Sequence, residues 1–251
     1  MVRVEQPEET NEMIQAVIRG EHFLPRMSIY MCPNDDGTHH LDVEITDRVA
    51  DVSFIGLLAD MTAGQAIITA RAPCEAATTH IEVHAVNNLV GPGTIVGRTR
   101  VLAVSKRRGV MESIFELNGQ YAIAHSTFNI REGELRGMIA PRRERQPIAE
   151  PMWSFVGAEQ TPLGSRITLG PLVANHTGAL QGGVTIALAE AAALGKLDDG
   201  EVLEGVSIHY LHPVRGGVAT AKATRYGRSI IVNVRADGEK KELARLTFTV
   251  A

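Results

Sequence analysis

The sequence predicts an α+β fold made of two similar halves, each with one long helix and several antiparallel strands. Each half contains an apolar run, rich in small and aliphatic residues, that holds a single carboxylate: Asp60 in the first and Glu190 in the second. Each run is followed by segments in which apolar and polar residues alternate, as in strands with one wet face. Because the two carboxylates are 130 positions apart along 251 residues, the same plan occurs twice.

Composition excludes several classes of protein. Hydrophobic residues make up 44% of the chain, enough for a well-filled core, and the net charge of −4 argues against a general nucleic-acid binder. The charged N-terminus is unlike a secretory signal, and we expect no apolar run to approach the roughly 20 residues that span a bilayer. Cys32 and Cys74 are expected to be reduced thiols. We therefore expect a cytoplasmic protein without a membrane or nucleic-acid partner.

Two helices are expected, over residues 53–66 and from residue 183 onward. The second contains no Pro after Gly183 and is rich in Ala and Leu, which favours a helix buried on most sides. Gly182 and Gly183 lie where this helix should begin, at the positive end of its dipole. Such an end binds an anion, or an oxygen that becomes anionic during a reaction.

Strands are expected on both sides of each helix. Residues 39–49 and 153–169 supply the strand before the first and the second helix, and a short helix over residues 8–20 could precede them all. Turns rich in Gly separate the later strands. Those strands are expected at residues 79–86, 94–104, 110–117 and 121–130 in the first half, and at 205–211, 217–224, 229–236 and 242–250 in the second.

The loop before the second helix carries a motif. Asn175, Gly178, Gly182, Gly183 and Glu190 match the spacing N-x-x-G-x-x-H-G-G followed by a helix with an acidic residue. This pattern resembles the active-site segment of hotdog-fold acyl-CoA thioesterases of the PaaI-like type, with Gln181 in place of the usual His. The resemblance covers nearly the whole chain and implies two hotdog domains in tandem, at residues 1–132 and 152–251, joined by a linker at 133–151.

The resemblance implies a site shared between the halves. Eight residues separate Gly182 from Glu190, which puts this carboxylate about 12 Å down the helix, too far for one thioester to touch both. In hotdog dimers the helix start of one unit meets the carboxylate of its neighbour. In this chain, Gly182 and Asn175 of the second half would then meet Asp60 and Thr78 of the first.

The opposite pairing implies a decayed or remodelled second site. There Glu190 would face Val52 as the backbone donor, and a Val side chain crowds an approach that Gly leaves open. Ile45 and Leu203 would take the places of the Asn and of the hydroxyl residue.

The activity implied by the resemblance is hydrolysis of an acyl-CoA thioester without a cofactor or metal. The Gly182 N–H would polarise the carbonyl, and losing one such donor typically costs about 10²–10³ in rate. Asp60 would act as a general base or as a nucleophile, Thr78 would position the carboxylate or the water, and Asn175 would orient water or the carbonyl. The same residues have structural explanations, because Asn favours turns and Thr can begin a strand.

Further residues are expected to contact substrate. Gln181, Gly183 and Glu190 would border the acyl group, and Arg107 and Arg108 belong to a basic run that suits either coenzyme A phosphates or solvent. Two other functions stay open: a non-catalytic acyl-CoA or acyl-group binder, and a hotdog hydratase or dehydratase with His176 as its base.

No metal site is expected. His80 and His84 lie on one face of a strand about 13 Å apart, too far for one ion. The expected partner is the acyl-CoA substrate, with acyl carrier protein left open as the carrier. Further assembly into a homo-oligomer of two-domain units is also left open.

Overall fold

The computed structural model describes residues 29–34, 37–46, 49–85, 89–133 and 149–251, with residues 12, 15, 16, 21 and 27. Most of the helix expected at 8–20 and most of the expected linker at 133–151 lie outside these residues. The domain division at residues 1–132 and 152–251 therefore stays a prediction.

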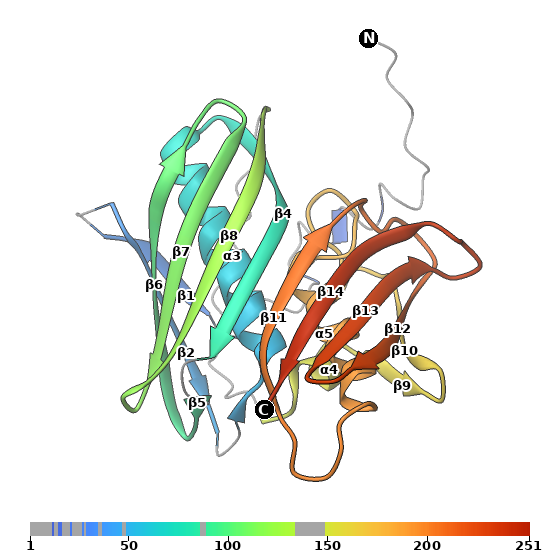
Figure 1. Cartoon of the computed structure of the whole chain (residues 1–251). Coiled ribbons are helices and arrows are strands. Elements are labelled where there is room, and N and C mark those ends of the chain that lie inside the picture. Colours follow the sequence, from blue (N-terminus) through green and yellow to red (C-terminus); the bar gives the residue numbers. More distant parts are fainter. Residues whose placement is uncertain are drawn as a thin grey trace, which may run out of the picture.

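One antiparallel sheet of 12 strands runs through both halves of the chain (Figure 1). In spatial order, its first half contains β1 (Tyr30–Pro33), β2 (His39–Ile45), β6 (Gly93–Val104), β7 (Arg108–Leu117), β8 (Gln120–Glu132) and β4 (Cys74–Ala85). Its second half contains β11 (Leu203–Tyr210), β14 (Glu242–Val250), β13 (Ser229–Ala236), β12 (Val218–Tyr226), β10 (Gly164–Thr168) and β9 (Glu159–Thr161). A short second ladder pairs β3 (Val49–Ala50) with β5 (Leu89–Val90).

Each half of the sheet curves over one long helix. Figure 1 shows α3 (Val52–Arg71) behind the strands of the first half and α5 (Gly182–Leu194) behind those of the second. The two helices also contact each other and so form part of the interface between the halves. Most apolar side chains of both helices and of the inward strand faces form one core, and a smaller cluster around Ile67 and Phe128 packs at the later turns of α3.

The halves are joined edge to edge by β4 and β11. Their register runs from His84 opposite Gly205 to His80 opposite His209. The rings of His80 and His209 stack at this seam, with centroids 4.5 Å apart. Alternation of apolar and polar residues predicts the strands but not this pairing, which depends on contacts between residues more than 120 positions apart.

The expected strand at residues 153–169 is right only in part, because strands occupy the later part of the segment and are not continuous. The segment forms a short helix, α4 (Met152–Phe155), and then the hairpin of β9 and β10. Gly157, with φ of 78°, follows the helix, and Gly164, with φ of 143°, begins β10. These backbone conformations favour Gly and interrupt a continuous strand.

Helix α3 also corrects the expectation about apolar runs. By length and composition it could cross a membrane, but 72% of that stretch is buried inside the protein. Phe54, Leu57 and Leu58 are fully buried on it. Packing between the sheet and α5 therefore accounts for its apolar character.

Candidate active site

The Asp60 carboxylate lies in the interface between the halves and is held from both sides. Thr78, on β4 of the same half, donates from Oγ1 to Oδ1 at 2.6 Å. Gln181, which precedes α5 in the other half, donates from Nε2 to Oδ2 at 2.7 Å. With only 9% of its surface exposed, Asp60 is shielded from bulk water and depends on these donors.

Gln181 is the residue that connects Asp60 to the start of α5. It is the N-cap of the helix, and its Oε1 accepts a hydrogen bond from the Val184 N–H at 2.9 Å. Because the amide oxygen caps the helix, the amide NH₂ must face the carboxylate. The place where the family motif has His is thus filled by a donor to Asp60, a contact that the sequence did not predict.

Gly182 and Gly183 allow α3 to approach the start of α5. A Cβ on Gly182 would lie 2.7 Å from Asp60 Oδ2, and a Cβ on Gly183 would lie 2.3 Å from Leu57 Cδ1. Any larger residue would therefore push the helix start away from Asp60. The first N–H groups of a helix have no partner inside it, and here the Gly183 N–H hydrogen-bonds to the Asp60 carboxylate.

The surroundings of Asp60 set its proton affinity. Burial raises the pKa of Asp60 to about 6, while the hydrogen bonds from Thr78 and from the Gly183 N–H act in the opposite direction. A carboxyl with this pKa is mostly ionised at neutral pH and still accepts a proton readily. This combination suits a general base.

Tyr210 is a site residue that sequence reasoning missed. Its hydroxyl donates to the Gly182 carbonyl at 2.9 Å, which ties the end of β11 to the first turn of α5. Burial, with a further contribution from the charge of Asp60, raises the pKa of Tyr210 well above its ordinary value. The phenol therefore stays protonated and continues to donate.

The Asn175 side chain forms its hydrogen bonds within its own loop and not with the Asp60 carboxylate. Its Oδ1 accepts from the Thr177 N–H at 2.9 Å, from the Thr177 hydroxyl at 2.8 Å and from the Ala179 N–H at 3.1 Å. These bonds favour the turn explanation over a direct contact with substrate. Asn175 shapes the loop whose Val173 carbonyl accepts from the Gln181 N–H at 3.0 Å.

Glu190 has the equivalent position at the start of α3. It is 2% exposed and accepts hydrogen bonds from the Ser53 N–H at 3.2 Å and the Ser53 hydroxyl at 2.6 Å. The backbone N–H and the hydroxyl of Ser53 thus both donate to the Glu190 carboxylate. Ser53 is the counterpart of Gly183, whose N–H bonds to Asp60 in the same way, while the role expected for Val52 as the donor to a substrate carbonyl stays a prediction. Of the other two residues expected at this second site, Ile45 is buried in the core, and Leu203 borders a cavity beside Glu190.

The basic run lies near the Asp60 end of the sheet. Arg107 belongs to the turn between β6 and β7, and both Arg107 and Arg108 are exposed. Thr78 pairs with Phe128, which in turn pairs with Gly109. Two strand spacings, about 10 Å, therefore separate the base of this turn from Thr78, within the reach of an Arg side chain toward a bound phosphate.

No group of three or more His, Cys, Asp or Glu residues gathers as a metal site within the described part of the chain. His84 lies 3.3 Å from Glu82, and His80 contacts Ser207 Oγ at 3.1 Å. These contacts give the two histidines structural partners on separate strands.

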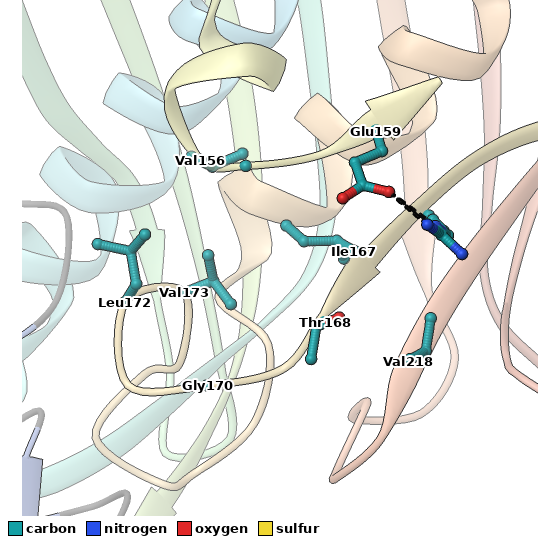
Figure 2. A pocket seen from close by; sticks show the side chains of 10 residues that line it. Val156, Glu159, Ile167, Thr168, Gly170, Leu172, Val173 and Val218 are labelled. Atoms are coloured by element: carbon teal, nitrogen blue, oxygen red, sulfur yellow. Dashed lines mark hydrogen bonds and ion pairs between the residues drawn. The ribbon is translucent and has the colours of Figure 1, made fainter. Parts of the chain in front are cut away.

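A cavity of about 430 Å³ lies elsewhere, between the loop at residues 170–173 and strands β10 and β12. Figure 2 shows Glu159 at its edge. The Glu159 carboxylate forms an ion pair with Arg166 at 2.7 Å. These two side chains neutralise each other, and none of the residues around Asp60 lines this space. We therefore locate the candidate site at Asp60.

Comparison with known proteins identifies the fold. No model of a protein family matches the chain, and no curated protein matches its sequence. Among solved structures, the acyl-ACP thioesterase of Bacteroides thetaiotaomicron is similar at 11% identity, with 86% of this chain and 99% of that chain covered and a TM-score of 0.60.

Two further structures agree. The 12:0-ACP thioesterase of Umbellularia californica has 10% identity, coverage of 86% and 97%, and a TM-score of 0.59. The tesB protein of Mycobacterium avium subs paratuberculosis has 10% identity, coverage of 92% and 98%, and a TM-score of 0.55. The chain has the hotdog fold of these proteins, which confirms the predicted fold class.

Proposed function

We propose that the protein hydrolyses acyl thioesters, with acyl-CoA as substrate, at a composite site formed by Asp60 and Thr78 of the first half and the start of α5 in the second. The observation that carries this proposal is the Gln181 to Asp60 hydrogen bond of 2.7 Å. It keeps a buried base beside the N–H groups of a helix start. A base next to a preformed oxyanion donor is the arrangement that acyl transfer to water requires.

The reaction begins when the thioester carbonyl accepts a hydrogen bond from the Gly182 N–H. Asp60 then takes a proton from water, and the water oxygen bonds to the carbonyl carbon. The Gly182 N–H and the positive end of the α5 dipole stabilise the resulting oxyanion. When the C–S bond breaks, the proton held by Asp60 passes to the leaving sulfur.

The contacts of Asp60 favour the general-base route over the nucleophilic one. Both carboxylate oxygens already accept a hydrogen bond, at 2.6 and 2.7 Å. These donors fix the carboxylate in place and reduce its nucleophilicity, while each oxygen keeps a lone pair that can accept a proton from water. A single turnover in H₂¹⁸O tests the nucleophilic route: water attack on the Asp60 carbonyl of an anhydride puts solvent oxygen into Asp60 and an Asp60 oxygen into the product, whereas a general base puts solvent oxygen into the product and none into Asp60.

The carrier is proposed to be coenzyme A, with Arg107 and Arg108 contacting its phosphates. A bound diphosphate accepts strong charge-assisted hydrogen bonds from guanidinium groups. Both cysteines, Cys32 and Cys74, are free thiols, which fits the reducing cytoplasm that we propose as the site of action.

Release of free thiol from a panel of acyl-CoAs tests the proposal, with acyl chains from short to long and aryl. Turnover should fall by about 10²-fold or more in Asp60→Asn and persist in Glu190→Gln, which alters the equivalent carboxylate. The proposal fails if the wild type binds acyl-CoA without turnover. It also fails if Glu190→Gln abolishes activity while Asp60→Asn retains it.

A further inference from the structure

The start of α3 borders a cavity that the proposed reaction does not use. Its volume is about 410 Å³, within the range of small-molecule pockets. Both halves contribute to its walls: Ile55 and Val83 come from the first, and Leu194 and Leu203 come from the second. Glu190 and Trp153 also line it.

This cavity is separated from the Asp60 site by the crossing of the two helices. A Cβ on Gly56 of α3 would lie 2.7 Å from Ile186 Cδ1 on α5. A Cβ on Gly183 of α5 would lie even closer to α3, at 2.3 Å from Leu57 Cδ1. The helices leave no room for an alkyl chain between them, so the cavity is not the acyl end of the thioester site.

The charges at the two helix starts differ. At α5 the capping side chain is the neutral Gln181, whereas at α3 it is Asp51, whose Oδ1 accepts from the Phe54 N–H at 2.7 Å. The Glu190 carboxylate lies at the same helix start, bonded to Ser53. Two carboxylates therefore offset the positive end of the α3 dipole, and an oxyanion there is disfavoured.

The rest of the lining adds no positive charge. Glu201 is a third acidic residue of the wall, and its Oε1 accepts from Arg225 Nη2 at 2.6 Å. Among those lining residues that the structure describes, there is no Lys or Arg. Burying an anionic head group beside Asp51 and Glu190 would be costly.

We propose that this cavity is a second ligand site, which binds an uncharged, mainly apolar small molecule with at most a hydrogen-bond donor as its head group. A medium-chain alcohol has this chemistry, because its alkyl chain fits the aliphatic walls and its hydroxyl can donate to a carboxylate. A fatty carboxylate of the same length is excluded by charge. The inference does not depend on the proposed thioesterase activity.

Trp153 provides the measurement. It is the only Trp in the chain and it lines the cavity, so its fluorescence reports occupancy. Titration with butan-1-ol, hexan-1-ol and octan-1-ol should give saturable changes, with Kd falling about fourfold for each added CH₂. The Kd of octanoate should be higher than that of octan-1-ol by at least about tenfold.

Variants separate this site from others. Ala85→Phe and Leu203→Phe fill the cavity and should each abolish the octan-1-ol response, so the test survives if one of them fails to fold. Val218→Phe fills the cavity of Figure 2 instead and should leave the response unchanged. Asp51→Asn keeps a helix cap but removes a charge, and it should narrow the difference between octan-1-ol and octanoate.

Three results would overturn the proposal. The first is no change in Trp153 fluorescence up to the solubility limit of octan-1-ol. The second is equal affinity for octan-1-ol and octanoate in the wild type. The third is an unchanged octan-1-ol response in a folded Ala85→Phe or Leu203→Phe variant, as judged by its thermal unfolding.

Discussion

Gln181 and Asp60 form a hydrogen bond of 2.7 Å between residues 121 positions apart, one from each half of the chain. The same Gln181 side chain caps α5 through its Oε1. The position of the carboxylate and the position of the helix start are therefore fixed by one amide group. This coupling makes Gln181 the most informative residue to change.

Gln181→Glu should inactivate the protein at neutral pH. A second carboxylate against Asp60 replaces a donor with a like charge and raises the pKa of Asp60. The kcat/KM should fall by about tenfold or more at pH 7, and the lower inflection of its pH profile should move upward from about 6.

Gln181→His is the control, because His can donate to Asp60 and is the residue that the family motif has there. It should keep activity within about tenfold of the wild type. Equal losses in the Glu and His variants would contradict the charge argument.

Thr78→Val should destabilise the protein most when Asp60 is ionised. Valine has the same shape but cannot donate to Oδ1, so a buried carboxylate oxygen loses its partner at 2.6 Å. The free energy of unfolding should fall by about 1–3 kcal/mol at pH 8 and by less at pH 5. Denaturant unfolding at the two pH values measures this, with Thr78→Ser as the variant that retains the hydroxyl. A loss that is the same at both pH values would show that the hydroxyl does not act on the charge.

Sequence patterns predict the helices, most strands and the two carboxylates, because burial and alternation leave a direct trace in residue type. The resemblance to hotdog thioesterases, and not the repeat alone, implies that Asp60 belongs with Gly182, because in hotdog dimers the helix start of one unit meets the carboxylate of its neighbour. No pattern in the sequence predicts the contact that Tyr210 makes at the site. Its hydroxyl bonds to a backbone carbonyl of a distant helix, and a Tyr at the end of a strand looks the same with or without that contact.

For Asn175 the sequence offers a role in the motif but cannot decide between catalysis and a turn. Its place in the motif suggested a catalytic contact, while its residue type was equally suited to a turn. The three hydrogen bonds within the loop favour the turn, which spacing alone cannot distinguish from a role toward substrate.

The stability of the protein should depend on pH through Asp60. The pKa of this carboxyl is about 6 in the folded protein and near 3.8 in an unfolded chain, so the folded state binds more protons between these values. The free energy of unfolding should therefore be highest below pH 4 and should fall as pH rises through 6, by about 3 kcal/mol from this group. In Asp60→Asn that part of the pH dependence should vanish. Unfolding curves for both proteins from pH 4 to pH 8 test this, and parallel curves would be inconsistent with a raised pKa.

Gly183→Ala should damage both stability and the site, because α3 packs directly against this position. The added Cβ would lie 2.3 Å from Leu57 Cδ1 and 2.6 Å from Leu57 Cα, and a backbone atom cannot move aside alone. We expect a loss of about 1–3 kcal/mol in the free energy of unfolding.

The matched control for Gly183→Ala is Gly195→Ala, at the other end of the same helix. There the nearest heavy atom to the added Cβ is 3.7 Å away, an ordinary contact, and the change should stay within about 0.5 kcal/mol. If α5 shifts to relieve the contact with Leu57, the Gly182 N–H moves away from Asp60, and kcat should fall even at temperatures where Gly183→Ala is fully folded. Thermal unfolding and thiol release measured on both variants separate the two effects. Equal stability of the two variants would mean that the helices are not packed as closely at Gly183 as these distances require.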